Sequence, residues 1–315
     1  MTKLVTNAKF DPDNVLLSDA KTGDIPTQIG ELILKKVVDD SLVTKLGKYE
    51  EMDALEKTFG YFAEGPGAYW VNEAEKIQTS KAKWLTLKMQ AHKIGVILPV
   101  SKEFLKFTVS DFFEQMKPKI GEAFQAKFDQ SVLFGADDSP FPKGISVFER
   151  AEAAGNIITK SDNTYTDIND LMSLVEEGDH EPQALATTRS LNKFLRGSLD
   201  SNGLPIFNGP RDGVTAETLG MPIAYGNKKS WDKEKALAMT GDFDNLIYGI
   251  PQGIEYSISE EATLSTIVGE DNAPINLFER DMIALKATMY AAFLTVQDDA
   301  FAALKPAGEP ARAEA

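Results

Sequence analysis

Few side chains in this sequence of 315 residues have the type and spacing that catalysis or metal binding requires. The absence of cysteine excludes thiol nucleophiles, disulfides and cysteine-ligated zinc. The two histidines, His92 and His180, lie far apart and have no histidine or cysteine nearby to complete a transition-metal site. We interpret His92 as a residue on the surface of a sheet and His180 as a loop residue.

Two groups of carboxylates could act as acid–base pairs or hold a cation. Glu64, Glu73 and Glu75 lie in a polar segment, where carboxylates are usually solvated or form surface ion pairs. Asp242 and Asp244 resemble the start of a calcium loop, but hydrophobic residues follow where ligands are needed, which favours a turn before a strand. The signature motifs of hydrolases, P-loop proteins and dinucleotide-binding proteins do not occur. We predict no catalytic, cofactor-binding or metal-binding residues, and we keep a soluble α+β enzyme using these carboxylates as a distant alternative.

The charge of the chain limits its partners. Asp and Glu number 48 against 33 Lys and Arg, which gives a formal net charge of −15. Surfaces that grip phosphate backbones or anionic membranes need clustered cations, so the composition disfavours binding to nucleic acid or to membranes. The sequence also lacks both a long apolar run and the hydrophobic segment of a secretory signal. We expect a soluble, acidic protein made in the cytoplasm.

The first half of the sequence predicts an arm, a short helix and a hairpin. Residues 1–30 have few periodic apolar positions and are typical of an extended arm. Two long strands joined through a polar tip predict a projecting hairpin, which is only marginally stable by itself and needs a surface to lie on. The expected elements are a helix over Ile33–Leu46 and strands over Thr58–Ala63, Tyr69–Asn72, Trp84–Met89 and Ile94–Val100.

Aromatic and basic side chains concentrate on the predicted hairpin. Aromatic residues that project from a hairpin usually bury against the body of the protein or against a neighbour. The lysines form the only local basic cluster, but glutamates are mixed with them, so the cluster is weak evidence for nucleic-acid binding. We predict that seven of these residues lie at a subunit interface: Tyr69, Trp70, Glu73, Lys76, Lys81, Lys83 and Trp84.

The longest predicted element is a helix over Asp111–Phe134, whose apolar residues keep i, i+3, i+4 spacing. Pro118 is expected to kink this helix and Gly135 to end it. A helix of this length could act as a spine for the molecule. The rest of the chain predicts helices over Asp167–Glu177, with Thr166 as N-cap, and Ser190–Leu195, and strands over Gln183–Thr187, Met221–Tyr225, Asn245–Ile250, Ile254–Ile258 and, with period two, Ile283–Phe293.

Short blocks of sequence follow one another in a distinctive order from about Ile33 to Leu304. They are Tyr69–Glu73, Leu87–Lys93, Val100–Leu105, Lys127–Gly135, Pro142–Ile145, Gly241–Ile254 and Asn276–Phe278, and then the strand that leads to Phe301. In order and spacing these blocks resemble the major capsid proteins of tailed bacteriophages, the family with the Hong Kong 97 phage fold. Each block is degenerate alone, so the resemblance depends on their succession.

The resemblance implies an α+β fold with an N-terminal arm, an extended β-hairpin loop, a peripheral domain with a long spine helix, and an axial domain. The implied ranges are 1–32 for the arm, 33–51 for a short helix and connection, 52–98 for the extended loop, 99–143 for the peripheral domain with its spine helix, 144–273 for the axial domain, 274–304 for the closing strand of the peripheral domain, and 305–315 for a disordered tail.

The resemblance also implies a structural function without enzymatic activity or cofactors. The chain is expected to self-assemble through hexamers and pentamers into an icosahedral shell that encloses double-stranded phage DNA without sequence-specific binding. Its expected location is the virion, with assembly in the host cytoplasm and no membrane contact. Expected partners are further copies of the chain, a portal protein and a separate scaffolding protein, unless a scaffolding segment has been cleaved. The main alternative is the shell protein of a bacterial encapsulin-type nanocompartment, which encloses an enzyme.

Overall fold

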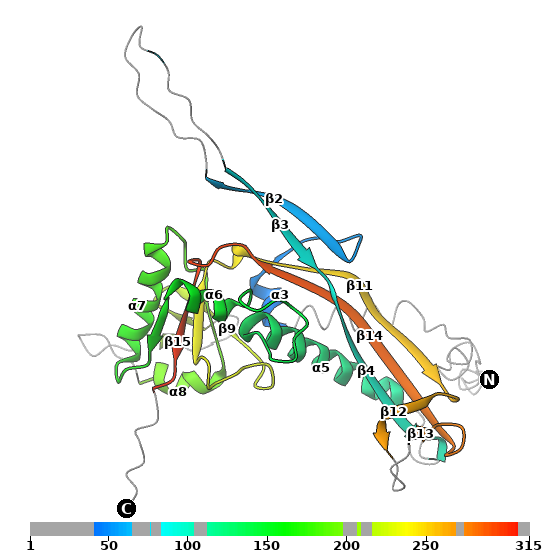
Figure 1. Ribbon diagram of the computed structural model, residues 1–315. Helices are drawn as coiled ribbons and strands as arrows, with labels where there is room; N and C mark the ends of the chain where they lie inside the picture. The colour runs from blue at the N-terminus through cyan, green and yellow to red at the C-terminus, as the bar shows by residue number, and fades with distance from the viewer. Residues whose placement is uncertain are drawn as a thin grey trace, which may run out of the picture.

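The computed structural model describes residues 41–64, 76, 83–103, 112–197, 207–208, 216–268 and 274–307. Within these residues the strands form a four-stranded sheet, a seven-stranded sheet and two two-stranded sheets. Figure 1 shows the four-stranded sheet extending away from the seven-stranded sheet, with the long helix α5 (Phe112–Phe134) running beside it. The mixture of helices and strands agrees with the predicted α+β class.

The four-stranded sheet has the order β1 (Lys48–Tyr49), β11 (Leu246–Ser259), β14 (Met282–Thr295) and β4 (His92–Ser101). Alternate residues of β14, including Ile283 and Leu285, are buried in one cluster with Phe124 and Phe128 of α5. The helix therefore covers one face of this sheet. The period-two strand and the long helix, which ends at Gly135 with φ of +60° as predicted, are confirmed.

Strand β11 is one element where the sequence predicts two. The strand has 14 residues and pairs with β14 from Leu246 to Ser259. The register shifts between Gly249 and Gln252 and again between Gln252 and Glu255. Pro251 lies at this irregular point and has no N–H to donate to a ladder. The proline interrupts the hydrogen-bonding pattern locally, but the pairing on both sides of it keeps the strand continuous.

The seven-stranded sheet has the order β5 (Ile157–Thr159), β15 (Phe301–Lys305), β10 (Ala238–Gly241), β6 (Ala184–Thr187), β9 (Met221–Tyr225), β8 (Glu217–Thr218) and β7 (Phe207–Asn208). Successive side chains of β15 point to opposite faces, as the strand geometry requires. Phe301 and Ala303 belong to the cluster that includes α5 and α6 (Val147–Ala154), whereas Ala302 and Leu304 belong to the cluster of α7 (Thr164–Glu177). Both faces are thus covered by helices.

Three helices differ from the sequence predictions. Helix α7 begins at Thr164 rather than at Asp167, and its N-cap is Asn163, whose side chain accepts from the Tyr165 N–H at 3.1 Å, rather than Thr166. Helix α6 is not predicted, although Ser146 and Glu149 form a reciprocal capping box at its start. The helix predicted over Ser190–Leu195 is a 3₁₀ turn, η3 (Arg189–Leu191), followed by α8 (Asn192–Leu195).

Two strands pair in a sheet other than that of their neighbours in the sequence, while the domain ranges that the resemblance implies stay a prediction. Strand β11 lies within residues 144–273 but pairs with β14 and β1 in the four-stranded sheet. Strand β15 lies within residues 274–304 except for its last residue, yet it pairs with β10 and β5 in the seven-stranded sheet. The chain therefore passes more than once between the two sheets.

The predicted hairpin is present as the antiparallel pair β2 (Glu56–Glu64) and β3 (Lys83–Gln90). A second small sheet pairs β12 (Thr263–Val268) with β13 (Pro274–Asn276). Helix α3 (Leu42–Leu46) begins after its own N-cap, Ser41, whose backbone is extended, so the helix predicted over Ile33–Leu46 is not continuous. Residues 33–40 lie outside the described residues. The predicted arm, most of the predicted tail and the strand over Tyr69–Asn72 lie outside the described residues. Among the described helices, none combines the length and the hydrophobicity needed to cross a membrane.

Candidate assembly surface

The base of the hairpin is fixed to the four-stranded sheet. Met52 and Met89 are buried with Ala292 and Leu294 of β14, and Met89 has no exposed surface. The Lys57 ammonium lies 2.6 Å from a carboxylate oxygen of Glu50 beside this cluster. Figure 1 shows β2 and β3 crossing over the strands of the sheet. The body of the protein therefore determines the direction in which the hairpin leaves it.

The seven predicted interface residues lie in the sequence between the end of β2 and the first two residues of β3. Lys83 and Trp84 begin β3, where they pair with Glu64 and Phe62 at the end of β2. Lys76 is exposed. The other four, Tyr69, Trp70, Glu73 and Lys81, lie outside the described residues. Their interface role therefore stays a prediction.

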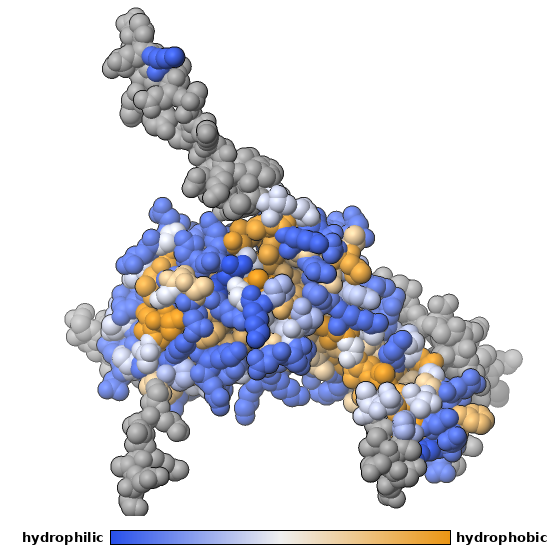
Figure 2. Space-filling view, viewed as in Figure 1, coloured by the Kyte–Doolittle hydropathy of each residue, from blue (hydrophilic) through white to orange (hydrophobic). Residues whose placement is uncertain are grey.

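Some large hydrophobic side chains of the body are exposed. Phe278, in the turn before β14, is 73% exposed, and Ile97 of β4 is 46% exposed. β4 is also a terminal strand of its sheet in the part of the chain that the structure describes. Figure 2 shows hydrophobic surface between hydrophilic residues on the side of the molecule where β4, β12 and β13 lie. Exposed apolar surface of this kind is typical of a protein that contacts other molecules.

The carboxylates considered for chemistry have structural roles where they are described. Asp242 caps the 3₁₀ turn η4 (Phe243–Asn245): its carboxylate accepts from the Asp244 N–H at 3.1 Å and from the Asn245 side-chain amide at 2.9 Å. The predicted turn before β11 is confirmed. Glu64 ends β2, and Glu73 and Glu75 lie outside the described residues. Among the described residues, no group of three or more histidine and carboxylate side chains could hold a metal ion.

His180 joins three segments of the chain. Its Nδ1 lies 3.3 Å from the Asp242 carboxylate and its Nε2 lies 3.3 Å from the Asp299 carboxylate. The residue is in the loop between α7 and β6, as predicted, but its side chain is only 10% exposed. Sequence reasoning missed this bridge because the two carboxylates are 62 and 119 residues away. His92 packs edge-on against the Phe141 ring, with 4.8 Å between ring centroids.

A buried carboxylate joins α5 to the start of α3. Asp129 of α5 has no exposed surface and accepts hydrogen bonds from the Ser41 hydroxyl and from the backbone N–H groups of Leu42, at 3.1 Å, and Val43, at 3.4 Å. Burial raises the pKa of Asp129 to about 6, against the opposing effect of these hydrogen bonds. This contact fixes the start of α3 to the long helix α5.

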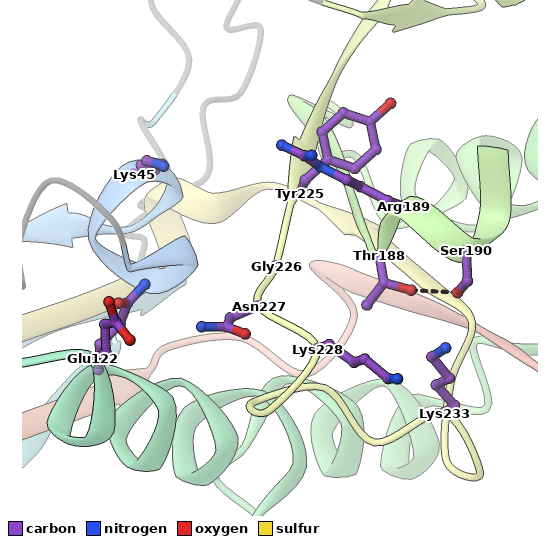
Figure 3. Close-up of a pocket in the computed structure, with 11 residues that line it drawn as sticks. Lys45, Glu122, Thr188, Arg189, Ser190, Tyr225, Gly226, Asn227, Lys228 and Lys233 are labelled. Carbon is purple, nitrogen blue, oxygen red and sulfur yellow. Dashed lines mark hydrogen bonds between the residues drawn. The ribbon is translucent and has the colours of Figure 1, made fainter. Parts of the chain in front are cut away.

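A basic hollow of about 580 Å³ lies at the end of the seven-stranded sheet. We define it by four cationic side chains, Lys45 of α3, Arg189 of η3, and Lys228 and Lys233 of the loop after β9. Figure 3 shows them around an opening that is also lined by Glu122 of α5 and by Thr188 and Ser190, whose hydroxyls are 2.6 Å apart.

The topology of the sheet positions this hollow. Strands β6 and β9 are parallel neighbours, and Thr188 and Gly226 directly follow their carboxyl ends. The carboxyl ends of adjacent parallel strands are frequent binding sites. Sequence reasoning missed the hollow because nothing in the local sequence indicates that β6 and β9 pair. The lysines that follow the predicted strand Met221–Tyr225 were the one available signal.

A long helix beside one sheet, a projecting hairpin and exposed apolar surface define a protein built for contact with other subunits. Several solved structures from phages resemble it. A chain from Microbacterium phage Oxtober96 matches with a TM-score of 0.72 and 27% identity, covering 85% of this chain and 91% of that one. A chain from Mycobacterium phage Adephagia matches with a TM-score of 0.73 and 23% identity, covering 86% and 91%.

The family model described as "Phage capsid family" matches residues 24–305. The major capsid protein of Staphylococcus phage 80alpha is 44% identical to this chain over 299 residues, which cover 95% of the chain and 90% of the relative. The chain belongs to the phage capsid family. It is a structural major capsid protein of a phage, a component of the virion that associates with copies of itself, and not an enzyme. The predicted family and function are confirmed over the nanocompartment and enzyme alternatives.

Proposed function

We propose that this chain assembles through hexamers and pentamers into an icosahedral shell around double-stranded DNA, and that the hairpin lies over an adjacent subunit. The four-stranded sheet with α5 would form the peripheral domain, and the seven-stranded sheet with α6, α7 and α8 would form the axial domain around the symmetry axes. The observation that carries this proposal is a two-stranded hairpin whose buried anchoring residues, among the side chains that the structure describes, lie near its base.

A hairpin of two strands has marginal stability in water by itself, so a long one needs a surface to pack on. Met89 and Leu87 provide that packing near the base, against β14 and β11. The predicted interface residues lie at and beyond the opposite end of β3, where Lys83 and Trp84 begin the strand. A neighbouring subunit would supply the missing surface for these residues.

Replacing residues 65–83 by a short Gly-Ser turn tests the role of the hairpin. Because the cluster around Met89 is retained, we expect a folded subunit with unchanged circular dichroism of the body that does not form shells. Sedimentation velocity and negative-stain microscopy would measure assembly. Normal closed shells from this variant would refute the proposed contact.

Point variants give a matched control for that deletion. Tyr69→Ala with Trp84→Ala removes aromatic surface and should lower the yield of shells, whereas Tyr69→Phe with Trp84→Phe keeps the rings and should assemble like the wild type. Equal yields from the two pairs would show that these aromatic side chains do not make the contact.

We further propose a portal protein and a separate scaffolding protein, or a cleaved scaffolding segment, as partners, with assembly in the host cytoplasm. The acidic composition supports a container whose wall does not bind the genome, because an anionic surface repels phosphate. Co-expression with a scaffolding candidate should raise the fraction of regular closed particles, and an unchanged fraction would refute that candidate.

A further inference from the structure

Positively charged side chains outnumber negatively charged ones around the basic hollow. Lys45, Arg189, Lys228 and Lys233 are exposed, and none of them forms an ion pair with a described carboxylate. The one acidic residue of the lining, Glu122, is 3.1 Å from the Lys119 ammonium. Four cations around one opening are notable in a chain of net charge −15, and they favour an anionic occupant.

The opposite end of the same sheet is acidic. The turn that leads from α7 into β6, together with η4, presents an acidic edge. We define this acidic edge by five exposed carboxylates: Glu176, Glu177, Asp179, Glu181 and Asp244. Arg150, the arginine near this end, is already paired with Asp298. The acidic edge is therefore an uncompensated negative surface among the described residues.

Strand β6 separates the two surfaces. The acidic edge precedes Ala184 and the basic hollow follows Thr187, so the strand places them about 13 Å or more apart, at about 3.3 Å per residue. One copy therefore cannot bring its own acidic edge into its own hollow. Two copies can join head to tail, and contacts of this heterologous type close into rings.

We propose that the basic hollow of one subunit receives the acidic edge of the next subunit in the capsid ring. This inference rests on the proposed function, because it specifies a contact within the hexamers and pentamers. Figure 1 shows the hairpin strands β2 and β3 on the side of the molecule where β15 begins, which is the side of the acidic edge. The hairpin and the acidic edge of one subunit can thus contact the same neighbour.

Charge complementarity would give this contact its direction. A ring whose subunits all point the same way pairs each acidic edge with a hollow, whereas a reversed subunit would face like charges. Exposed ion pairs are individually weak, but the same contact recurs at every position around the ring. The contact should also weaken with added salt, because its charges are near the surface.

Charge reversal tests the proposal on the full chain. Lys228→Glu with Lys233→Glu changes two exposed side chains of the hollow, and Glu177→Lys with Glu181→Lys changes two of the acidic edge. Each pair should reduce the fraction of protein that sediments as closed shells by about tenfold, because like charges would then face each other. The quadruple variant restores opposite charges and should recover that fraction to within about twofold of the wild type.

Lys143→Glu with Lys286→Glu is the matched control, because it changes the net charge equally at two exposed lysines outside the hollow. It should assemble like the wild type. Folded double variants that assemble normally, or a quadruple variant that does not recover, would overturn the proposed contact while leaving the shell function intact. A wild-type chain that forms no shells would instead overturn the proposed function and this contact with it.

Should a charge-reversed pair fail to fold, judged by circular dichroism, the neutral pair Lys228→Gln with Lys233→Gln takes its place. Its shells should lose the salt sensitivity of wild-type assembly. Unchanged salt sensitivity in this variant would overturn the proposal.

Discussion

At the scale of residues, buried polar side chains join segments that are distant in the sequence. Asp129 joins α5 to the first described residues of the chain, and His180 joins the loop after α7 to Asp242 and Asp299. A buried carboxylate with hydrogen-bond donors around it fixes geometry, but its charged form also loses hydration. The balance between these effects can be measured at Asp129.

Asp129→Asn should remove a pH dependence of stability. The folded-state pKa of Asp129 is raised from the ordinary value of 3.8 to about 6. Its contribution to the free energy of unfolding is therefore greatest below pH 3.8 and is lost as the pH rises through about 6. Relative to the variant, the free energy of unfolding of the wild type should fall by roughly 2 kcal/mol between about pH 4.5 and about pH 7. Urea unfolding of the unassembled subunit measures this difference.

Asp138 provides the contrasting control. It is exposed, and its hydrogen bond with the Lys127 ammonium lowers its pKa. The pH dependence of stability that Asp138→Asn removes should therefore be opposite in sign to that of Asp129→Asn. The wild type should lose stability relative to Asp138→Asn as the pH falls. A difference between Asp129→Asn and the wild type that stays constant with pH would contradict the assignment of Asp129.

Gly241 of β10 tolerates no side chain. A Cβ at this position would lie 2.7 Å from Cδ1 of Phe301 and closer still to the Ala300 carbonyl oxygen. Gly241→Ala should therefore lower the free energy of unfolding by about 1–3 kcal/mol through overpacking. Gly197→Ala is the control, because its new Cβ would be 3.5 Å from the nearest atom and should change stability by less than about 0.5 kcal/mol.

At the scale of elements, capping determines where the shorter helices begin. Ser146 accepts from the Glu149 N–H at 3.3 Å and donates its hydroxyl to the Glu149 carboxylate at 2.7 Å, and the chain then enters α6. This helix buries Val147, Phe148 and Ala151 against α5 and β15. Loss of the cap should therefore loosen the contact between the long helix and the seven-stranded sheet.

Ser146→Ala should lower the free energy of unfolding by about 1 kcal/mol, since it leaves the Glu149 N–H without its partner. Ser173→Ala is the matched control within α7, where the hydroxyl bonds only to the Asn169 carbonyl of the same helix. Denaturant unfolding of both variants measures the difference. Equal stability of the two would show that the capping box contributes nothing.

At the scale of the whole molecule, one hydrophobic cluster connects the two main sheets. It contains Ile283 and Phe293 of the four-stranded sheet together with Met239 and Phe301 of the seven-stranded sheet. Phe134, at the end of α5, packs within it against Phe148 and Trp231, at ring-centroid distances of 6.3 and 5.2 Å. A shared core predicts that both sheets unfold together.

Phe134→Ala should lower the free energy of unfolding by about 3–5 kcal/mol and leave a single transition. Circular dichroism reports on both sheets, and fluorescence in a Trp70→Phe, Trp84→Phe background reports on Trp231 alone, because the chain has three tryptophans. The two signals should coincide. Separate transitions would show that the sheets are independent units.

The amino-acid sequence alone determined the local elements whose signals are continuous along the chain. The long helix and the period-two strand at Ile283 follow from periodicity, and the order of short motifs indicated the capsid family. These patterns are local because helix contacts and side-chain alternation repeat within a few residues.

Only the tertiary structure decided which strands share a sheet and which charges share a surface. Phe301–Lys305 pairs between β5 and β10 in the seven-stranded sheet although it follows β14 closely in the sequence. Lys45 lines the same hollow as Lys228 although it belongs to a helix far away in the sequence. Strand partners and surface clusters depend on contacts between residues distant in the sequence. No local propensity encodes those contacts, because they form only when the whole core packs.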